Sequence, residues 1–216
     1  FTILPKPPEG LRVFSETHPF QEQWYNNNSP VLGWEKPPGI TGVSFVLDDK
    51  PFTTPDTVPE DTDTTIGYQD LPDGLRYFHI KAQSRGVWGA TTHFLVRVDT
   101  TPPAVFTPKL EILTAAIISK IIVSFSTTDA LSGLDHYEVG ILEKANESSA
   151  PLFVESTSPY QLTPRVSGDL RIIVRAFDRA GNVRDELVDV QVPFALFLFL
   201  KNNILLLPLG AILLLH

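Results

Sequence analysis

The sequence predicts an all-β protein made of two tandem β-sandwiches, followed by a C-terminal hydrophobic segment. First, the stretch 73–82 is echoed by the stretch 168–176, and Ala82 and Ala176 are 94 residues apart, about the length of one small β-domain. Second, 19 prolines and 13 glycines divide the chain into many short segments, as all-β proteins require. Third, residues 193–216 are mostly leucine and other apolar residues.

Composition excludes several classes of function. The net charge is −8, and the lysines and arginines form no cluster that could contact a phosphate backbone, which argues against nucleic acid as a partner. Cysteine is absent, and this excludes disulfides, thiolate chemistry and cysteine-based zinc sites. Hydrophobic residues make up 43% of the chain, so each half has enough apolar side chains to build a core.

The first half begins with an expected linker over residues 1–15, where prolines at 5, 7 and 8 favour an extended chain. Methionine is absent, so we expect this linker to follow an upstream region. A first module is expected over residues 16–99, with a polar loop or edge region over 48–65. Its strands are predicted at 31–35, 42–47, 77–82 and 92–98, and residues 65–68 lead to a predicted turn at 71–74.

The repeated stretch shows the period of two that a half-buried strand requires. In the first copy Phe78, Ile80 and Ala82 alternate with polar or aromatic residues. Their counterparts in the second copy are Ile172, Val174 and Ala176. The inward-facing residues are therefore expected to recur, while the outward-facing residues differ.

The second half starts with a proline hinge over residues 100–103, because two prolines block strand pairing and keep the chain extended. A second module is expected over 104–192. Residues 111–118 are predicted as a strand and a turn rather than a helix, since β-branched residues follow them. The other predicted strands are 121–125, 136–142, 170–177 and 187–192.

Residues 193–216 are expected to form a membrane anchor. Two apolar runs, 194–200 and 204–215, flank Lys201, and neither reaches the roughly 20 residues of a spanning helix. Either the whole segment spans with a costly central lysine, or Lys201 lies at the headgroups and a span begins at Ile204. We favour the second arrangement and expect the span to continue beyond His216. A buried core helix is the alternative.

Two sets of residues resemble known families. Residues 32–38, with Trp34 followed by prolines, resemble the B-strand of fibronectin type III domains, and Leu71 and Tyr77 are spaced as in the tyrosine corner of that family. In the second module, 129–135 and 175–182 resemble the immunoglobulin-like repeats of bacterial surface proteins. The resemblance implies two immunoglobulin-like sandwiches of a membrane-tethered bacterial protein, with the modules on the extracellular side.

Three aromatic residues are candidate ligand contacts. Trp24 and Tyr25 precede three asparagines in a polar loop, and Trp88 follows a glycine turn, so these rings can stack on a sugar. The alternative is that they cover the ends of a sandwich. Trp34 lies within an apolar strand and is expected in the core.

Oxygen ligands in the second module allow a calcium site. Asp129, Asp135, Asp178 and Asn182 lie in turn-like segments and can supply some of the six to eight oxygens that calcium takes. We favour the simpler interpretation that each of them fixes its own turn through the backbone. Gly181 is expected to adopt a positive φ there.

No catalytic, cofactor-binding or metal-binding residue is predicted. His79 and His93 fall on neighbouring predicted strands, so the two rings can approach one another, but we favour separate solvent-facing positions because no histidine has a partner at metal-ligand spacing. The acids at 48–49, and Asp61 with Asp63, are interpreted as solvated loop residues rather than a glycosidase pair.

We therefore expect a non-enzymatic surface protein whose modules act as spacer, adhesion or presentation elements at the cell membrane. Its partners are expected to be the membrane, through the C-terminal segment, and a protein or polysaccharide at the cell surface. The alternative is a carbohydrate-binding or other ligand-binding module accessory to a secreted enzyme.

Overall fold

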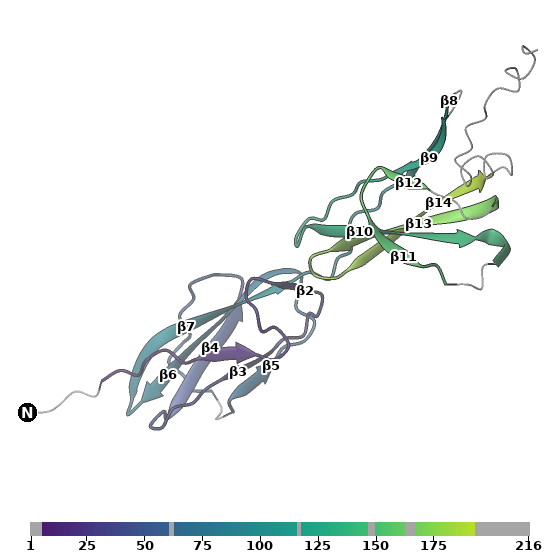
Figure 1. Ribbon diagram of the computed structural model, residues 1–216. Coiled ribbons are helices and arrows are strands. Elements are labelled where there is room, and N and C mark those ends of the chain that lie inside the picture. Colours follow the sequence, from purple (N-terminus) through teal and green to yellow (C-terminus); the bar gives the residue numbers. More distant parts are fainter. Residues whose placement is uncertain (1–5, 61–62, 116–117, 147–149, 163–166, 193–216) are drawn as a thin grey trace, which may run out of the picture. The chain divides into compact units, whose positions relative to one another are not determined.

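The computed structural model describes residues 6–60, 63–115, 118–146, 150–162 and 167–192. Within these ranges the chain is all-β except for one short 3-10 turn, η1 (Lys144–Asn146) (Figure 1). Contacts divide it into a first unit, Phe1–Thr101 with Arg179–Asn182, and a second unit, Pro102–Asp178 with Val183–His216. The first boundary falls within the segment expected to join two modules.

Seven strands of the first unit form two sheets. The three-stranded sheet has the order β1-β3-β5, and the four-stranded sheet has the order β2-β7-β6-β4. All pairings are antiparallel except that between β2 and β7, which is parallel. The bounds are β1 Val13–Ser15, β2 Trp24–Tyr25, β3 Val31–Trp34, β4 Gly42–Asp48, β5 Thr65–Gly67, β6 Gly74–Ser84 and β7 Val87–Val98.

The core of the first unit lies between these sheets. Leu32 and Trp34 come from the three-stranded sheet, whereas Phe78 and Ile80 come from the four-stranded one, and all four are at most 2% exposed. Trp34 packs against Phe78 with ring centroids 6.1 Å apart. The expectation that Trp34 is a core residue is confirmed.

The second unit has the same plan. Its sheets have the orders β12-β9-β8 and β11-β10-β13-β14. Ile121, Val123, Ile172 and Val174 form the centre of its core and are fully buried. The bounds are β8 Lys109–Ala115, β9 Ile118–Ser124, β10 Leu134–Glu143, β11 Phe153–Ser156, β12 Tyr160–Leu162, β13 Gly168–Asp178 and β14 Val183–Val192.

The sequence repeat corresponds to strands β6 and β13, which hold the same place in their units. Phe78, Ile80 and Ala82 on β6 are fully buried, and so are their counterparts Ile172, Val174 and Ala176 on β13. Each strand also begins at a glycine in the left-handed region, Gly74 with φ 120° and Gly168 with φ 114°. The predicted recurrence of a core pattern is therefore confirmed.

The two units differ in their seventh strand. Six strands pair equivalently, because β1-β3-β5 corresponds to β8-β9-β12 and β7-β6-β4 corresponds to β14-β13-β10. In the first unit the additional strand, β2, pairs with β7; in the second unit the additional strand, β11, pairs with β10. Each unit is thus an immunoglobulin-like sandwich extended at the opposite edge of its larger sheet.

Every strand predicted from alternation is present, and 109–115 is a strand rather than a helix, as expected. The linker expected over residues 1–15 is wrong at its C-terminal end. Leu11 is 3% exposed within the core, and β1 pairs with β3 through Val13–Ser15. Prolines stiffen only the preceding residues, so the first sandwich begins earlier than the composition suggested.

The membrane anchor expected over residues 193–216 lies outside the described residues. Among those that the structure describes, no helix has both the length and the apolar character needed to cross a bilayer.

Candidate functional site

The candidate site is a histidine pair on the outer face of the four-stranded sheet of the first unit. Tyr77, His79 and Lys81 alternate along β6 with three core residues, so their side chains point away from the core. His79 is nevertheless 0% exposed. Something other than the core must therefore cover this ring.

The cover is the polar segment 49–60, between β4 and β5. Asp48 turns the chain, because its carboxylate accepts the Lys50 N–H at 2.8 Å and the Thr53 hydroxyl at 2.5 Å. The segment then returns along β4, where Glu60 pairs with Val43 in an isolated antiparallel bridge. The hydrogen bond from Thr53 lowers the pKa of Asp48, so this side chain is a carboxylate at neutral pH.

Hydrogen bonds to the cover fix which nitrogen of His79 carries the proton. His79 Nε2 lies 2.9 Å from the Lys50 carbonyl oxygen and 3.2 Å from Asp48 Oδ1. Both oxygens only accept, so Nε2 is the donor. Neutral His79 therefore presents the lone pair of Nδ1 on the other side of its ring.

That lone pair faces His93, which stands directly opposite on β7. The two Nδ1 atoms are 2.5 Å apart, and the rings cross at 77° with centroids 4.8 Å apart. Because His79 Nδ1 accepts, His93 Nδ1 donates, and the outer nitrogen of His93 keeps a lone pair. Two doubly protonated rings cannot keep this contact, since both Nδ1 atoms would then be donors.

His93 is the accessible member of the pair. Its side chain is exposed, and the ring of Phe52, itself 84% exposed, packs edge-on against it at 5.8 Å. Desolvation at the sheet surface, and then the nearby charge of His79, lower the pKa of His93. At neutral pH the surface of the unit therefore carries a neutral imidazole that is coupled to a buried one.

Sequence reasoning placed these histidines on neighbouring strands, and the pairing of β6 with β7 confirms this. The expectation that both face solvent is right for His93 and wrong for His79. The physical reason is the cover, which starts about 30 residues before His79 in the chain. Alternation reports which face of a strand a residue occupies, but it does not report what lies over that face.

The three candidate aromatics do not form one surface. Trp24 stands opposite Arg97 near the end of β7, and the Arg97 guanidinium lies 5.9 Å from its ring. Trp88 lies at the start of the same strand, with Lys81 Nζ 5.0 Å from its ring. Nine residues of extended strand separate these positions by about 30 Å. Tyr25 is engaged locally, since its hydroxyl bonds both main-chain groups of Phe20.

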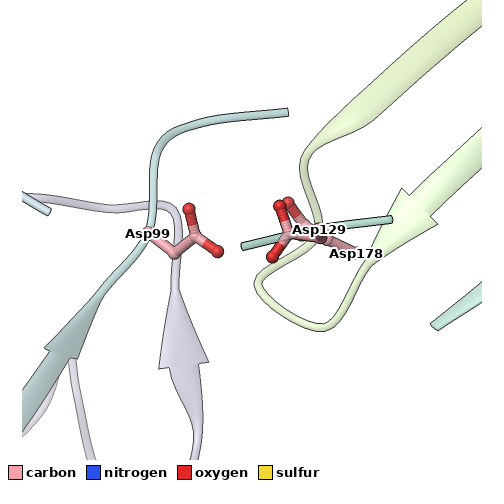
Figure 2. A group of neighbouring side chains, drawn as sticks. All are labelled: Asp99, Asp129 and Asp178. Carbon is pink, nitrogen blue, oxygen red and sulfur yellow. The ribbon is translucent and has the colours of Figure 1, made fainter. Parts of the chain in front are cut away.

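The oxygen ligands considered for calcium are only partly brought together. Asp129 and Asp178 of the second unit lie side by side, with carboxylate oxygens within 4.8 Å (Figure 2). Asp135 instead pairs with its neighbour His136 at 2.7 Å. Asn182 belongs to the first unit, and so does Asp99, which Figure 2 also labels.

The structure confirms that Asp129 fixes a turn. Its carboxylate accepts the main-chain N–H groups of Leu131 at 3.0 Å and Gly133 at 2.8 Å. Gly181 has φ 90°, as its place in a tight turn predicted. The interpretation of these segments as turns therefore holds for Asp129 and Gly181.

The acidic residues considered as a glycosidase pair do not share one environment. Asp48 is engaged by Thr53 and Lys50 within the cover, while Asp49 and Asp63 are exposed. Asp61 lies outside the described residues.

No protein-family model and no curated protein matches this sequence. Two similar solved structures are the FN1–FN3 domains of chicken CNTN1 and fibronectin(III)-like modules of Clostridium thermocellum CbhA. The first is 15% identical over 87% of this chain and 68% of that chain, with a TM-score of 0.42. The second is 15% identical over 84% of this chain and 94% of that chain, with a TM-score of 0.41.

Proposed function

We propose that this chain is a non-catalytic pair of fibronectin type III-like modules that act as spacer, adhesion or presentation elements of a bacterial surface protein. The C-terminal segment 193–216 tethers them to the cell membrane, and the modules face the extracellular side. A protein or polysaccharide at the cell surface is the partner class.

The observation that carries this proposal is what the two units share. Their fully buried strand residues and their positive-φ glycines recur at equivalent positions of β6 and β13. The outer faces do not recur, because Tyr77 and His79 on β6 correspond to Arg171 and Ile173 on β13. A spacer requires a repeated fold and does not require a repeated binding face.

The outer face of the second unit carries paired charges, as expected of a spacer whose surface is solvated. On its four-stranded sheet Arg175 pairs with Asp185 and Arg171 pairs with Asp189, and Lys144 of η1 also pairs with Asp189. Alternating charges of this kind keep the broad face of a sheet solvated. The net charge of −8 acts in the same direction by opposing self-association.

The tether is tested by deleting residues 193–216 and fractionating cells that secrete either form. The chain that retains residues 193–216 is expected in the membrane fraction, with its modules digested by protease added to intact cells. The shortened chain is expected to be soluble and to keep its thermal unfolding transitions. Continued membrane association of the shortened chain, or protection of the modules in intact cells, would overturn the proposal.

Ligand binding is the alternative, and two separate surfaces carry it. Trp24 and Trp88 are both half-buried, so each offers part of an aromatic ring on which a sugar can stack. Trp24→Ala and Trp88→Ala are measured separately on a polysaccharide column. Loss of retention in one variant, with an unchanged unfolding midpoint, would favour this alternative; no retention of the intact chain would end it.

A further inference from the structure

The two Nδ1 atoms of His79 and His93 converge on one point on the outer face of the four-stranded sheet, between the buried ring of His79 and the exposed ring of His93. Each imidazole reaches that point from a different strand, and the strands are held in register by the pairing of β6 with β7. We propose that this point is a binding site for a borderline divalent transition-metal ion, of which Zn²⁺ and Ni²⁺ are the test cases, with both Nδ1 atoms as ligands. On binding, the His93 proton moves from Nδ1, where it now donates to His79, to Nε2, so that both Nδ1 lone pairs face the ion.

The surroundings of His79 are those of a metal-binding imidazole. A histidine ligand donates its second ring N–H to a carboxylate or a backbone carbonyl, which fixes the tautomer and makes the ligand nitrogen more basic. His79 Nε2 has both kinds of acceptor, Asp48 Oδ1 and the Lys50 carbonyl oxygen. The cover thus orients a lone pair toward His93 before any ion arrives.

The spacing of the two nitrogens requires a small movement of the accessible ring. A tetrahedral ion with Zn–N bonds of about 2.0–2.1 Å holds two nitrogen ligands about 3.3 Å apart. The present separation of 2.5 Å must therefore grow by roughly 0.8 Å. His93 is exposed, and the Phe52 ring that packs against it is itself 84% exposed, so a rotation of the His93 side chain supplies this distance.

Charge and ligand chemistry select the class of ion. The site combines two imidazoles with the nearby Asp48 carboxylate, whose negative charge favours a cation. Imidazole suits zinc, nickel and copper, whereas calcium and magnesium prefer oxygen ligands.

The test is calorimetric titration of the full chain with ZnCl₂ and with NiCl₂ at pH 7.5. We expect one site that His93→Gln weakens at least tenfold. Asp48→Asn is expected to weaken it by about 10- to 100-fold without removing a ligand, as loss of such an outer partner does. His136→Gln is the matched control, since His136 also lies beside a carboxylate, Asp135. Circular dichroism checks that each variant is folded.

Three results would overturn the proposal. They are no binding by the intact chain, unchanged binding by His93→Gln, and equal loss in His136→Gln. Heat from CaCl₂ that persists in His93→Gln reports carboxylate sites elsewhere and does not count as support. Long-range ¹⁵N–¹H spectra of the imidazoles give a second readout: Zn²⁺ must shift the Nδ1 resonances of both rings, and a shift confined to Nε2 of His93 would contradict the assigned ligand atoms.

Discussion

Arg175 on β13 binds both carboxylate oxygens of Asp185, which stands directly opposite on β14. Nε donates to Oδ1 at 2.8 Å, and a terminal nitrogen donates to Oδ2 at 2.9 Å. The guanidinium carbon also lies 3.9 Å from the centroid of the Phe153 ring on β11. The hydrogen bond to Asp185 raises the pKa of Arg175. One side chain therefore joins contacts from three strands of the sheet.

Replacing Asp185 is expected to destabilise the second unit. In Asp185→Asn the bidentate pair is lost, and because the pair is partly exposed we expect a loss of about 0.5–1 kcal/mol in the free energy of unfolding. Urea unfolding measures it, and the loss should shrink at about 1 M salt, where screening is strong. Glu155→Gln, which removes an exposed acid from the same sheet, is the control. An equal loss in both variants would assign the effect to net charge.

The glycines that begin β6 and β13 are expected to resist substitution. Gly74 and Gly168 have φ near 120°, where a side chain is strained although no atom lies within 4 Å of an added Cβ. Gly74→Ala and Gly168→Ala should each cost about 1–3 kcal/mol of unfolding free energy. Gly67→Ala is the control, because Gly67 has no positive φ and meets only Val31 at 3.9 Å. If Gly168→Ala left the free energy of unfolding unchanged, the claim that a side chain is strained at this φ would be wrong.

The two cores are expected to respond separately to cavities. Ile80→Ala truncates a fully buried residue of the first core, and Ile172→Ala does the same in the second. Each should cost about 2–5 kcal/mol. Differential scanning calorimetry is expected to resolve two transitions, with only one of them lowered by each variant. If both transitions moved together, the units would unfold as one cooperative body.

Acid is expected to destabilise the first unit through His18. This ring is 1% exposed, and its Nε2 donates to the Asn27 carbonyl at 2.8 Å. Desolvation lowers its pKa below 6.5, although the bond to Asn27 acts in the opposite direction. Between the folded and the unfolded pKa the unfolded chain binds a proton at His18 that the folded chain does not bind. The contribution of His18 to the free energy of unfolding is therefore fully present above pH 6.5 and falls as the pH drops toward the folded pKa.

Urea midpoints measured between pH 8 and pH 5 check this prediction. His18→Gln should be less stable at pH 8 and should show a shallower decline on acidification. Asp73→Asn serves as the comparison. Desolvation acts to raise the pKa of Asp73, but the hydrogen bonds from Thr101 and Thr100 together lower it below the ordinary value of 3.8. The stability that Asp73 contributes is therefore lost only as the pH falls below 3.8, outside the range in which His18 titrates. An unchanged slope in His18→Gln would rule out His18 as the titrating group.

Much of the fold follows from local patterns. The period of two along Phe78, Ile80 and Ala82 identified a strand and its buried face, because burial on one side of a sheet leaves a signal in neighbouring residues. The strands that sequence reasoning missed are short: β2 has two residues, β1, β5 and β12 have three each, and β11 has four. Such strands hold too few residues for alternation to stand out, and tertiary pairing defines them.

The candidate site depended on contacts that no local pattern contains. Alternation along β6 predicts that His79 is exposed, but the segment 49–60, which is distant in sequence, covers it. Trp24 and Trp88 were proposed together because of their type, and the length of β7 separates them. Asp129 was assigned correctly as a turn residue, since that role involves only its own neighbours.

The segment 49–60 also determines what the edge of a sheet offers to other molecules. β4 is an outer strand of its sheet, and Glu60 satisfies its backbone twice: the Glu60 N–H donates to the Val43 carbonyl at 2.8 Å, and its carboxylate accepts the Phe45 N–H at 3.0 Å. An unpaired edge is a template for intermolecular strand addition, and an acidic segment laid along it prevents this. In the second unit the added strand β11 occupies the equivalent edge. Removing residues 49–60 would therefore open the first unit to aggregation, whereas the second unit has its own covering strand.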